Sequence, residues 1–171
     1  FDVTTVALSS QTITFSNPGT QTYGTAPTLS ATASSGLTVS FSADASSSGV
    51  CAITSGGALT FVATGNCTIH ADQVGNSTYS SAPTVSHTFA VNPGTQATLT
   101  VSATSITPSY GSTVTLSTTG GSGTGAVSYS SNNANCTISG STLTAAAVGS
   151  CTVTATKAAD TTYSAATATI G

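Results

Sequence analysis

Few side chains in this sequence could take part in chemistry, and its cysteines are the most informative of them. The 171 residues include four cysteines, two histidines, one lysine and four acidic residues, all of them aspartate. Cys51 and Cys67 form one closely spaced pair, and Cys136 and Cys151 form another. Each cysteine is in phase with a branched apolar residue two positions on, so its side chain is expected to face a core.

This placement predicts one structural disulfide within each pair. A loop of roughly 15 residues closed by a disulfide stabilises a fold by roughly 3 kcal/mol in the chain-entropy model. Neither pair has the CxxC spacing of a redox-active dithiol, so a redox role is not expected. The alternative, four buried free thiols, would require a reducing compartment.

The histidines and aspartates do not form a recognisable catalytic or metal-binding set. A Ser-His-Asp mechanism needs a histidine that is oriented by a buried acid beside an activated serine. His70 is expected on the solvated face of a strand, His87 lies in a later strand, and no G-x-S-x-G turn is present. Asp44 and Asp72 occur in turn-like contexts, which leaves a shared calcium site only as a weak alternative. We therefore predict no enzymatic activity, no cofactor and no metal.

The near absence of charge excludes several kinds of partner. Charged residues make up 3% of the chain, and the formal net charge is −3. Nucleic acids and anionic membrane surfaces attract clustered lysine and arginine, and this chain has one lysine. No apolar run approaches the ~20 residues that span a bilayer, so this segment is not expected to insert into a membrane. Serine, threonine and paired cysteines instead indicate an extracellular or cell-surface location.

An internal repeat organises these residues. Residues 67–79 and 151–163 share the same spacing from cysteine to tyrosine, and each begins as an alternating strand and ends in a polar turn. A repeat of roughly 85 residues predicts two domains, 10–92 and 93–171, with residues 1–9 as a linker or the end of a preceding repeat.

The pattern within each repeat predicts the fold class. About seven short alternating segments are separated by glycine, proline, asparagine and serine turns, without helical periodicity. In the first domain we expect strands at 11–15 and 27–33, then a third whose inward face carries Leu37, Val39 and Phe41. The prediction is an all-β protein made of two tandem immunoglobulin-like antiparallel β-sandwiches, each with one disulfide.

These motifs resemble a known family. The order Tyr-Gly, Cys-x-Ile, Leu-Thr-Phe and Gly-Asn-Cys-Thr-Ile-x-Ala-x-Gln-x-Gly-Asn-x-x-Tyr is similar to the tandem bacterial immunoglobulin-like (Big/MBG-type) repeats of large secreted and cell-surface proteins. The resemblance covers the chain from about Ser10 onward and implies a β-sandwich used as a spacer, stalk or adhesive module. The second repeat departs from the first in one turn, where Lys157 and Ala159 replace Gln73 and Gly75.

The function predicted is a non-catalytic structural segment of an extracellular bacterial surface protein, such as a stalk, adhesin shaft or fibre. One alternative is a subunit of an extracellular filament or sheath, because the chain has almost no charge to guard its strand edges. Another is a module that binds carbohydrate or a host protein through loops 45–49 and 120–125. Tyr79 and Tyr163 are candidates for end-packing or ligand-contact aromatics. Expected partners are further repeats of the chain, other copies of it, and glycans.

Overall fold

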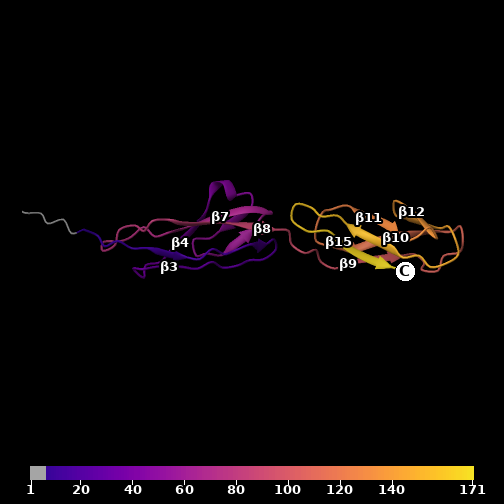
Figure 1. The fold of residues 1–171 in the computed structure, drawn as a ribbon, viewed down its shortest axis with the longest axis horizontal. Helices are drawn as coiled ribbons and strands as arrows, with labels where there is room; N and C mark the ends of the chain where they lie inside the picture. The colour runs from indigo at the N-terminus through magenta and orange to yellow at the C-terminus, as the bar shows by residue number, and fades with distance from the viewer. Residues whose placement is uncertain (1–6) are drawn as a thin grey trace, which may run out of the picture. The chain divides into compact units, whose positions relative to one another are not determined.

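The chain divides into two compact units, which meet in sequence between Asn92 and Pro93 (Figure 1). The computed structural model describes residues 7–171, so most of the predicted linker at 1–9 lies outside the described residues. The predicted fold class is confirmed, because both units are β-sandwiches with one disulfide each. Among residues 7–171 there is no α-helix, and no helix has the length and apolarity needed to cross a membrane.

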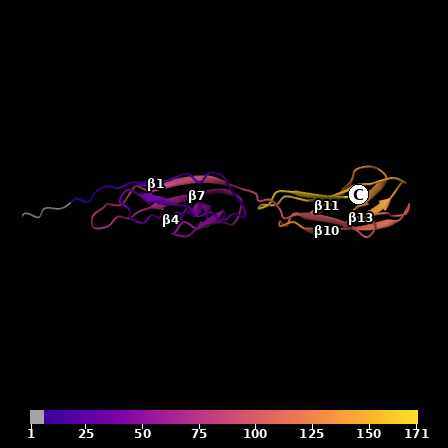
Figure 2. The same cartoon turned by 90° about the horizontal axis from the view of Figure 1, so that it is seen from below.

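Unit 1, the part that ends at Asn92, has two layers of strands (Figure 2). One layer holds the pairs β1–β3 and β5–β6, which the bridge between Thr28 and Ala58 connects, and the other is a sheet in the order β2-β8-β7-β4. The strands are β1 (Ile13–Phe15), β2 (Gln21–Thr22), β3 (Ala31–Ala33), β4 (Ser40–Ala43), β5 (Cys51–Ile53), β6 (Leu59–Phe61), β7 (Gly65–Asp72) and β8 (Val85–Asn92).

Unit 2 repeats this arrangement with sheets in the orders β12-β13-β10-β9 and β11-β14-β15. Figure 2 shows β11 in one layer and β10 and β13 in the other. Its strands are β9 (Leu99–Ala103), β10 (Thr113–Gly120), β11 (Val127–Ser131), β12 (Cys136–Ser139), β13 (Thr142–Ala145), β14 (Val153–Lys157) and β15 (Ala166–Ile170).

Several strands are shorter than the alternation predicts. The first two expected strands shrink to β1 and β3, and the third becomes β4, with Val39 and Phe41 buried and Leu37 only half-buried. Pro27 lacks a backbone N–H and so weakens the start of the second strand. The expected loop after Asp44 contains a short 3₁₀ helix, η1 (Ala45–Ser47), whose first turn is capped by the Asp44 carboxylate.

Strand β2 is the feature that breaks the symmetry between the units. It pairs in parallel with the end of β8, with Gln21 opposite Val91, and Tyr23 N donates to Asn92 O at 2.8 Å. The equivalent positions in unit 2, counted back from Tyr110, are Pro108 and Ser109, and neither lies in a strand. Alternation alone had predicted only antiparallel pairing, because side-chain periodicity carries no information about strand direction.

Each core lies between the two layers and is crossed by the disulfide. In unit 1, Cys67, Ile69 and Ala71 of β7 are completely buried, since alternate residues of a strand face the same side. The disulfides join Cys51 of β5 to Cys67, and Cys136 of β12 to Cys151 just before β14. Each therefore joins one layer to the other.

We expect the two disulfides to stabilise their units to the same degree, because their sequence separations are 16 and 15 residues. Replacing both cysteines of one pair by alanine should lower the free energy of unfolding of that unit by about 3 kcal/mol. Denaturant unfolding followed by residue-resolved NMR would measure each unit separately. The Cys51→Ala/Cys67→Ala and Cys136→Ala/Cys151→Ala variants are controls for each other, and a loss shared equally by both units would contradict independent folding.

Candidate functional site

The chain enters each unit beside a turn that ends in a tyrosine, Tyr79 in unit 1 and Tyr163 in unit 2. We call it the tyrosine turn. In unit 1, Ser9 N donates to Thr78 O at 2.8 Å, and Ser80 N donates to Ser9 O at 2.9 Å. The same two bonds recur in unit 2, where Gly94 N donates to Thr162 O and Ser164 N donates to Gly94 O, both at 2.9 Å. We call this arrangement the anchor of each unit. It joins the first residues of each unit to a turn that lies late in the sequence of the same unit.

A buried glutamine lies at the centre of the unit 1 anchor. Gln11 is 3% exposed, and its Nε2 donates to Ser80 O at 2.7 Å and to Gln73 Oε1 at 3.0 Å. Gln73 is also buried, and its Nε2 donates to Thr38 O at 3.1 Å. Ser35 Oγ donates to Gln11 Oε1. The two amides therefore form a hydrogen-bonded network that joins four segments of unit 1.

Unit 2 keeps the first glutamine and replaces the second. Gln96 is 7% exposed, and its Nε2 donates to Ser164 O at 2.8 Å and to Ala158 O at 3.3 Å. Lys157 stands where unit 1 has Gln73 and lies over Gly121, where an added Cβ would come within 2.5 Å of Lys157 Cδ. Sequence analysis did not single out Gln11 or Gln96. They could have been found from the sequence, because each repeat starts with a glutamine at the same place. This glutamine follows by two positions the residue that pairs with the tyrosine turn, Ser9 in unit 1 and Gly94 in unit 2.

The tyrosine turn is held by one acceptor side chain in each unit. Asn76 Oδ1 accepts from Thr78 N and Tyr79 N at 2.8 and 2.9 Å. Asp160 Oδ1 takes the same role and accepts from Thr162 N and Tyr163 N, both at 2.8 Å. Such side-chain acceptors mimic a backbone turn, which explains why asparagine and aspartate alternate at this position.

Asp160 has a second role that Asn76 lacks. Its Oδ2 accepts from Thr124 N at 2.6 Å, so the loop at 120–125 is fastened to the tyrosine turn. Backbone N–H donation from Thr162, then from Thr124 and Tyr163, holds the pKa of Asp160 well below its usual range. The glycines of this loop allow the close approach: an added Cβ on Gly125 would lie 2.0 Å from Ala158 O.

The predicted aromatic residues lie at these anchors. Tyr79 and Tyr163 are both half-buried and follow the turn acceptors directly. Asp160 and Tyr163 contact the glycine loop together, since an added Cβ on Gly123 would come within 2.5 Å of Asp160 Oδ2 and 3.4 Å of Tyr163 Cβ. Their role as end-packing or ligand-contact residues stays a prediction.

The structure brings together one Asp-His-Ser set that sequence analysis had kept apart. His70 Nδ1 lies 2.7 Å from Ser86 Oγ, and His70 Nε2 lies 3.3 Å from Asp44 Oδ2. His70 is half-buried rather than solvated, and both of its ring nitrogens have partners. Asp44 also caps η1, and hydrogen bonds from the Ser46 hydroxyl and backbone hold its pKa below the usual value.

This set lies on an open sheet face and lacks the rest of a catalytic site. Hydrolytic triads also need donors for an oxyanion beside the nucleophile. Ser86 is exposed near the start of β8, and neither the cavity at the end of unit 2 nor the one beside β3 and β4 is lined by Ser86 or His70. The corresponding residues of unit 2, Thr154 and Thr169, cannot form such a set. We assign the contacts to cross-strand stabilisation.

The remaining polar candidates serve the fold. His87 Nε2 lies 2.8 Å from Phe15 O, and its ring packs 5.0 Å from the Phe15 ring. Asp72 accepts from Thr84 Oγ1. Within residues 7–171 no group of three or more histidine, cysteine or acidic side chains could hold a metal ion.

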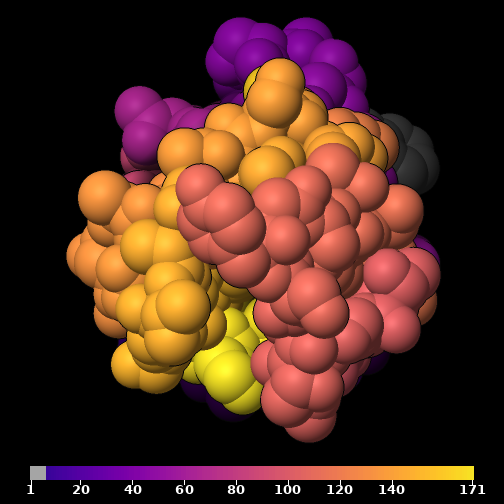
Figure 3. All heavy atoms as spheres, turned by 90° about the vertical axis from the view of Figure 1, so that its right-hand side faces the viewer, coloured from indigo at the N-terminus to yellow at the C-terminus, as the bar shows by residue number. Residues whose placement is uncertain are grey.

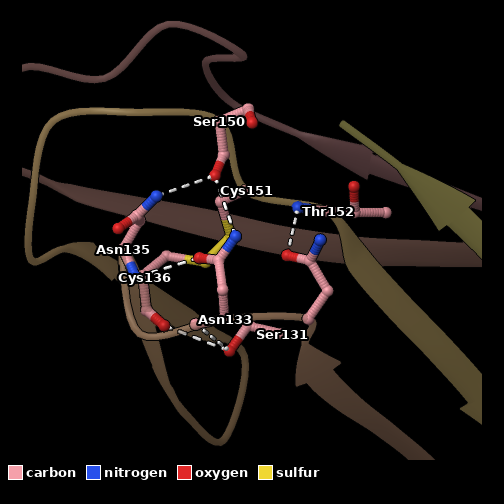
Figure 4. The surroundings of a disulfide bond; sticks show 8 residues. Ser131, Asn133, Asn135, Cys136, Ser150, Cys151 and Thr152 are labelled. Carbon is pink, nitrogen blue, oxygen red and sulfur yellow. Dashed lines mark hydrogen bonds between the residues drawn. A yellow bond between two sulfur atoms is a disulfide. The ribbon is translucent and has the colours of Figure 1, made fainter.

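Asparagine side chains surround the unit 2 disulfide (Figure 4). Asn133 Nδ2 and Asn135 Nδ2 both donate to Ser150 O, at 3.0 and 3.1 Å, and Thr152 N donates to Asn132 Oδ1 at 2.9 Å. Hydrogen bonds from asparagine side chains thus hold the segment that carries Cys151. In unit 1 the equivalent Thr68 N donates to Ser47 Oγ at 3.0 Å, and the segment also pairs with β8.

The buried Gln11 amide of the unit 1 anchor should stabilise its unit more than the half-buried amide of Gln21 does. Gln11→Ala removes the side-chain donor to Ser80 O and one of the two donors to Gln73 Oε1, whose other donor is Gly75 N, so unit 1 should lose about 1–3 kcal/mol of unfolding free energy. Gln21→Ala is the matched control, because its amide donates only within a local turn, to Pro18 O and Gly19 O. Equal losses in thermal unfolding for both variants would refute the assignment.

Acid should destabilise unit 2 through Asp160, the only acidic side chain between residues 93 and 171. The folded pKa lies below the unfolded value of about 3.9, so the stabilisation is present above that pH and is lost as pH falls below it. In the Asp160→Asn variant the unfolding free energy of unit 2 should fall less between about pH 5 and about pH 2 than in the wild type. In the Asn76→Asp variant the unfolding free energy of unit 1 should fall more over the same pH range. Unfolding curves of both variants with unchanged pH dependence would contradict this.

No protein-family model and no curated protein matches the sequence. Among solved structures the chain is similar to human protocadherin-24 EC1-2, with a TM-score of 0.39 and 13% identity over 94% of each chain. It is also similar to mouse cadherin-23 EC22-24, with a TM-score of 0.38 and 12% identity over 95% of this chain and 65% of that one. A third similar structure is the S-layer protein rSbsC, with a TM-score of 0.34 and 19% identity over 96% of this chain and 28% of that one.

Proposed function

We propose that the chain is a non-catalytic structural segment of an extracellular bacterial surface protein. It would consist of two bacterial immunoglobulin-like repeats, 10–92 and 93–171, that act as spacers in a stalk, adhesin shaft or fibre. The polar groups described above support this proposal, because they are used in caps, turns and anchors. Two disulfides and a surface rich in serine and threonine support an extracellular location.

The observation that carries the proposal is where the chain enters and leaves unit 1. Gly65 pairs with Val91 at one end of β7, where the chain leaves the unit. Ala71 pairs with Val85 at the other end, next to the turn that receives Ser9. The six residue steps from Gly65 to Ala71 separate these points by about 20 Å. A unit of this kind adds length each time it is repeated in a chain.

The strand pairing of unit 1 suits it to carry tension. Pulling on the two ends draws β2 and the end of β8 in opposite directions along their common axis. Because these strands are parallel, their hydrogen bonds resist together rather than opening one after another. Unit 2 has no parallel pair at the equivalent position. The disulfides also keep 16 and 15 residues of the two units from extending.

Single-molecule stretching of the chain tests this role. We expect two separate unfolding events, with unit 1 unfolding at the higher force because of its parallel pair. A reductant should lengthen each unfolded unit by roughly 50 Å, the extended length of the loop that the disulfide closes. Cys51→Ala/Cys67→Ala should remove the reduction-sensitive length from unit 1 alone and so identify its event. Unfolding without discrete events, or a stronger unit 2, would contradict a tension-bearing spacer.

A further inference from the structure

Serine and threonine cover the outer face of the β12-β13-β10-β9 sheet of unit 2. Alternate residues of a strand point to opposite sides of a sheet, and here the inward set forms the core. Strand β10 carries four of the outward hydroxyls in one line, and all four residues are exposed: Thr113, Thr115, Ser117 and Thr119. Figure 3 looks onto the end of unit 2 at which β10 begins, with the segment that leads into β10 in salmon.

The register of the sheet places a second hydroxyl beside each of these four. The opposed pairs are Thr113 and Thr144, Thr115 and Thr142, Ser117 and Ser102, and Thr119 and Thr100. We call these residues the hydroxyl face. Its spacing is about 6.8 Å along β10 and about 4.8 Å from strand to strand, so the hydroxyls repeat in two perpendicular directions.

Many of these hydroxyl groups are available to water. Two pairs bond within the face, Ser102 Oγ to Ser117 Oγ at 2.7 Å and Thr119 Oγ1 to Thr100 Oγ1 at 3.4 Å. Among residues 7–171, the threonine hydroxyls that β10 and β13 place opposite each other have no partner in the protein. All of these threonines are exposed except Thr144, which is half-buried, so their hydrogen bonds are made with solvent.

The face lacks the groups with which proteins bind most other ligands. Protein interfaces rely on aromatic and arginine anchors, and small-molecule sites are concave and apolar. The four strands of this sheet contain no aromatic and no charged residue. Neither the cavity at the end of unit 2 nor the one beside β3 and β4 is lined by a residue of the hydroxyl face. The face is therefore a neutral, regular set of hydrogen-bond donors and acceptors.

We propose that the hydroxyl face binds the surface of ice. Oxygen atoms on the prism faces of ice repeat in two perpendicular directions, at distances close to the two spacings of this face. Water molecules held by the threonine hydroxyls therefore lie near lattice positions and continue the crystal. The methyl groups of threonine lie between them and lose their hydration without the cost of burying a polar group.

The twist of the sheet decides how far this match extends. Neighbouring strands are rotated by about 20–25° relative to one another, so hydroxyls two strands away tilt out of the plane of contact. Strand β10 has hydroxyl-bearing neighbours on both edges, β13 along its first half and β9 along its second. Strand β10 is therefore the centre of the contact, with Thr115 near its middle.

The corresponding layer of unit 1 does not form such a face. Alanine interrupts its hydroxyls at two places, with Ala58 opposite Thr28 and Ala52 opposite Thr60. Ice binding is therefore a property of unit 2. It adds a ligand to the proposed structural role and fails independently of it, because a spacer needs no ligand.

The test grows ice slowly from a dilute solution of the full chain and compares the protein concentration in the ice with that in the remaining liquid. Ordinary proteins are excluded from growing ice, whereas the wild type should be enriched in it. Thr115→Lys should lower this enrichment at least about tenfold, because the ammonium group would lose hydration against the crystal. Thr115 is exposed, so the variant should keep the fold, which its NMR spectrum checks.

Thr167→Lys is the matched control. Thr167 is an exposed residue of β15, in the other sheet of unit 2, and it also points outward from its strand. The same substitution there adds the same charge to the same unit without touching the hydroxyl face. The enrichment of this variant in ice should equal that of the wild type.

Three results would overturn the proposal. The first is a wild type that is excluded from ice as fully as serum albumin. The second is equal enrichment of the wild type and Thr115→Lys, or a loss caused by Thr167→Lys, because the contact then lies elsewhere. The third is binding to crystalline cellulose that depends on Thr115, without enrichment in ice, which would assign the face to a polysaccharide.

Discussion

The pairing of β7 with β8 is the interaction on which the rest of unit 1 depends. It runs from Gly65 opposite Val91 to Ala71 opposite Val85, and it buries the apolar face that carries Cys67, Ile69 and Phe89. The disulfide joins this sheet to the other layer, and β2 adds to the free edge of β8. In unit 2 the equivalent pairing runs from Lys157 opposite Ala166 to Val153 opposite Ile170, and no parallel strand adds to β15.

The polar side chains described above form hydrogen bonds mainly with the chain's own backbone. Gln11 and Gln96 hold the anchors, Asn76 and Asp160 hold the tyrosine turns, and Asp44 caps a short helix. A chain with so few charges must satisfy buried backbone groups with amides and hydroxyls, which accept and donate without the cost of burying an ion. Within residues 7–171 no buried side-chain polar atom lacks a hydrogen-bond partner.

The two units share the same arrangement of strands but differ in the residues of their cores. Unit 1 has the aromatic contact between Phe15 and Phe41, at 5.4 Å between ring centroids. Unit 2 has a core of smaller residues, such as Val114, Leu116 and Val153. An exposed strand edge in a protein with almost no charge to protect it is a site where another chain can add.

The sequence by itself determined the all-β class and the two sandwiches, because period-two alternation and turn residues act locally and recur in both repeats. The cysteines and Tyr79 and Tyr163 were also identifiable from their spacing. Only the tertiary structure revealed the parallel strand β2, the buried glutamines and the contact of His70 with Asp44 and Ser86. Each of these depends on residues far apart in the chain, whose pairing direction and distance leave no trace in local periodicity.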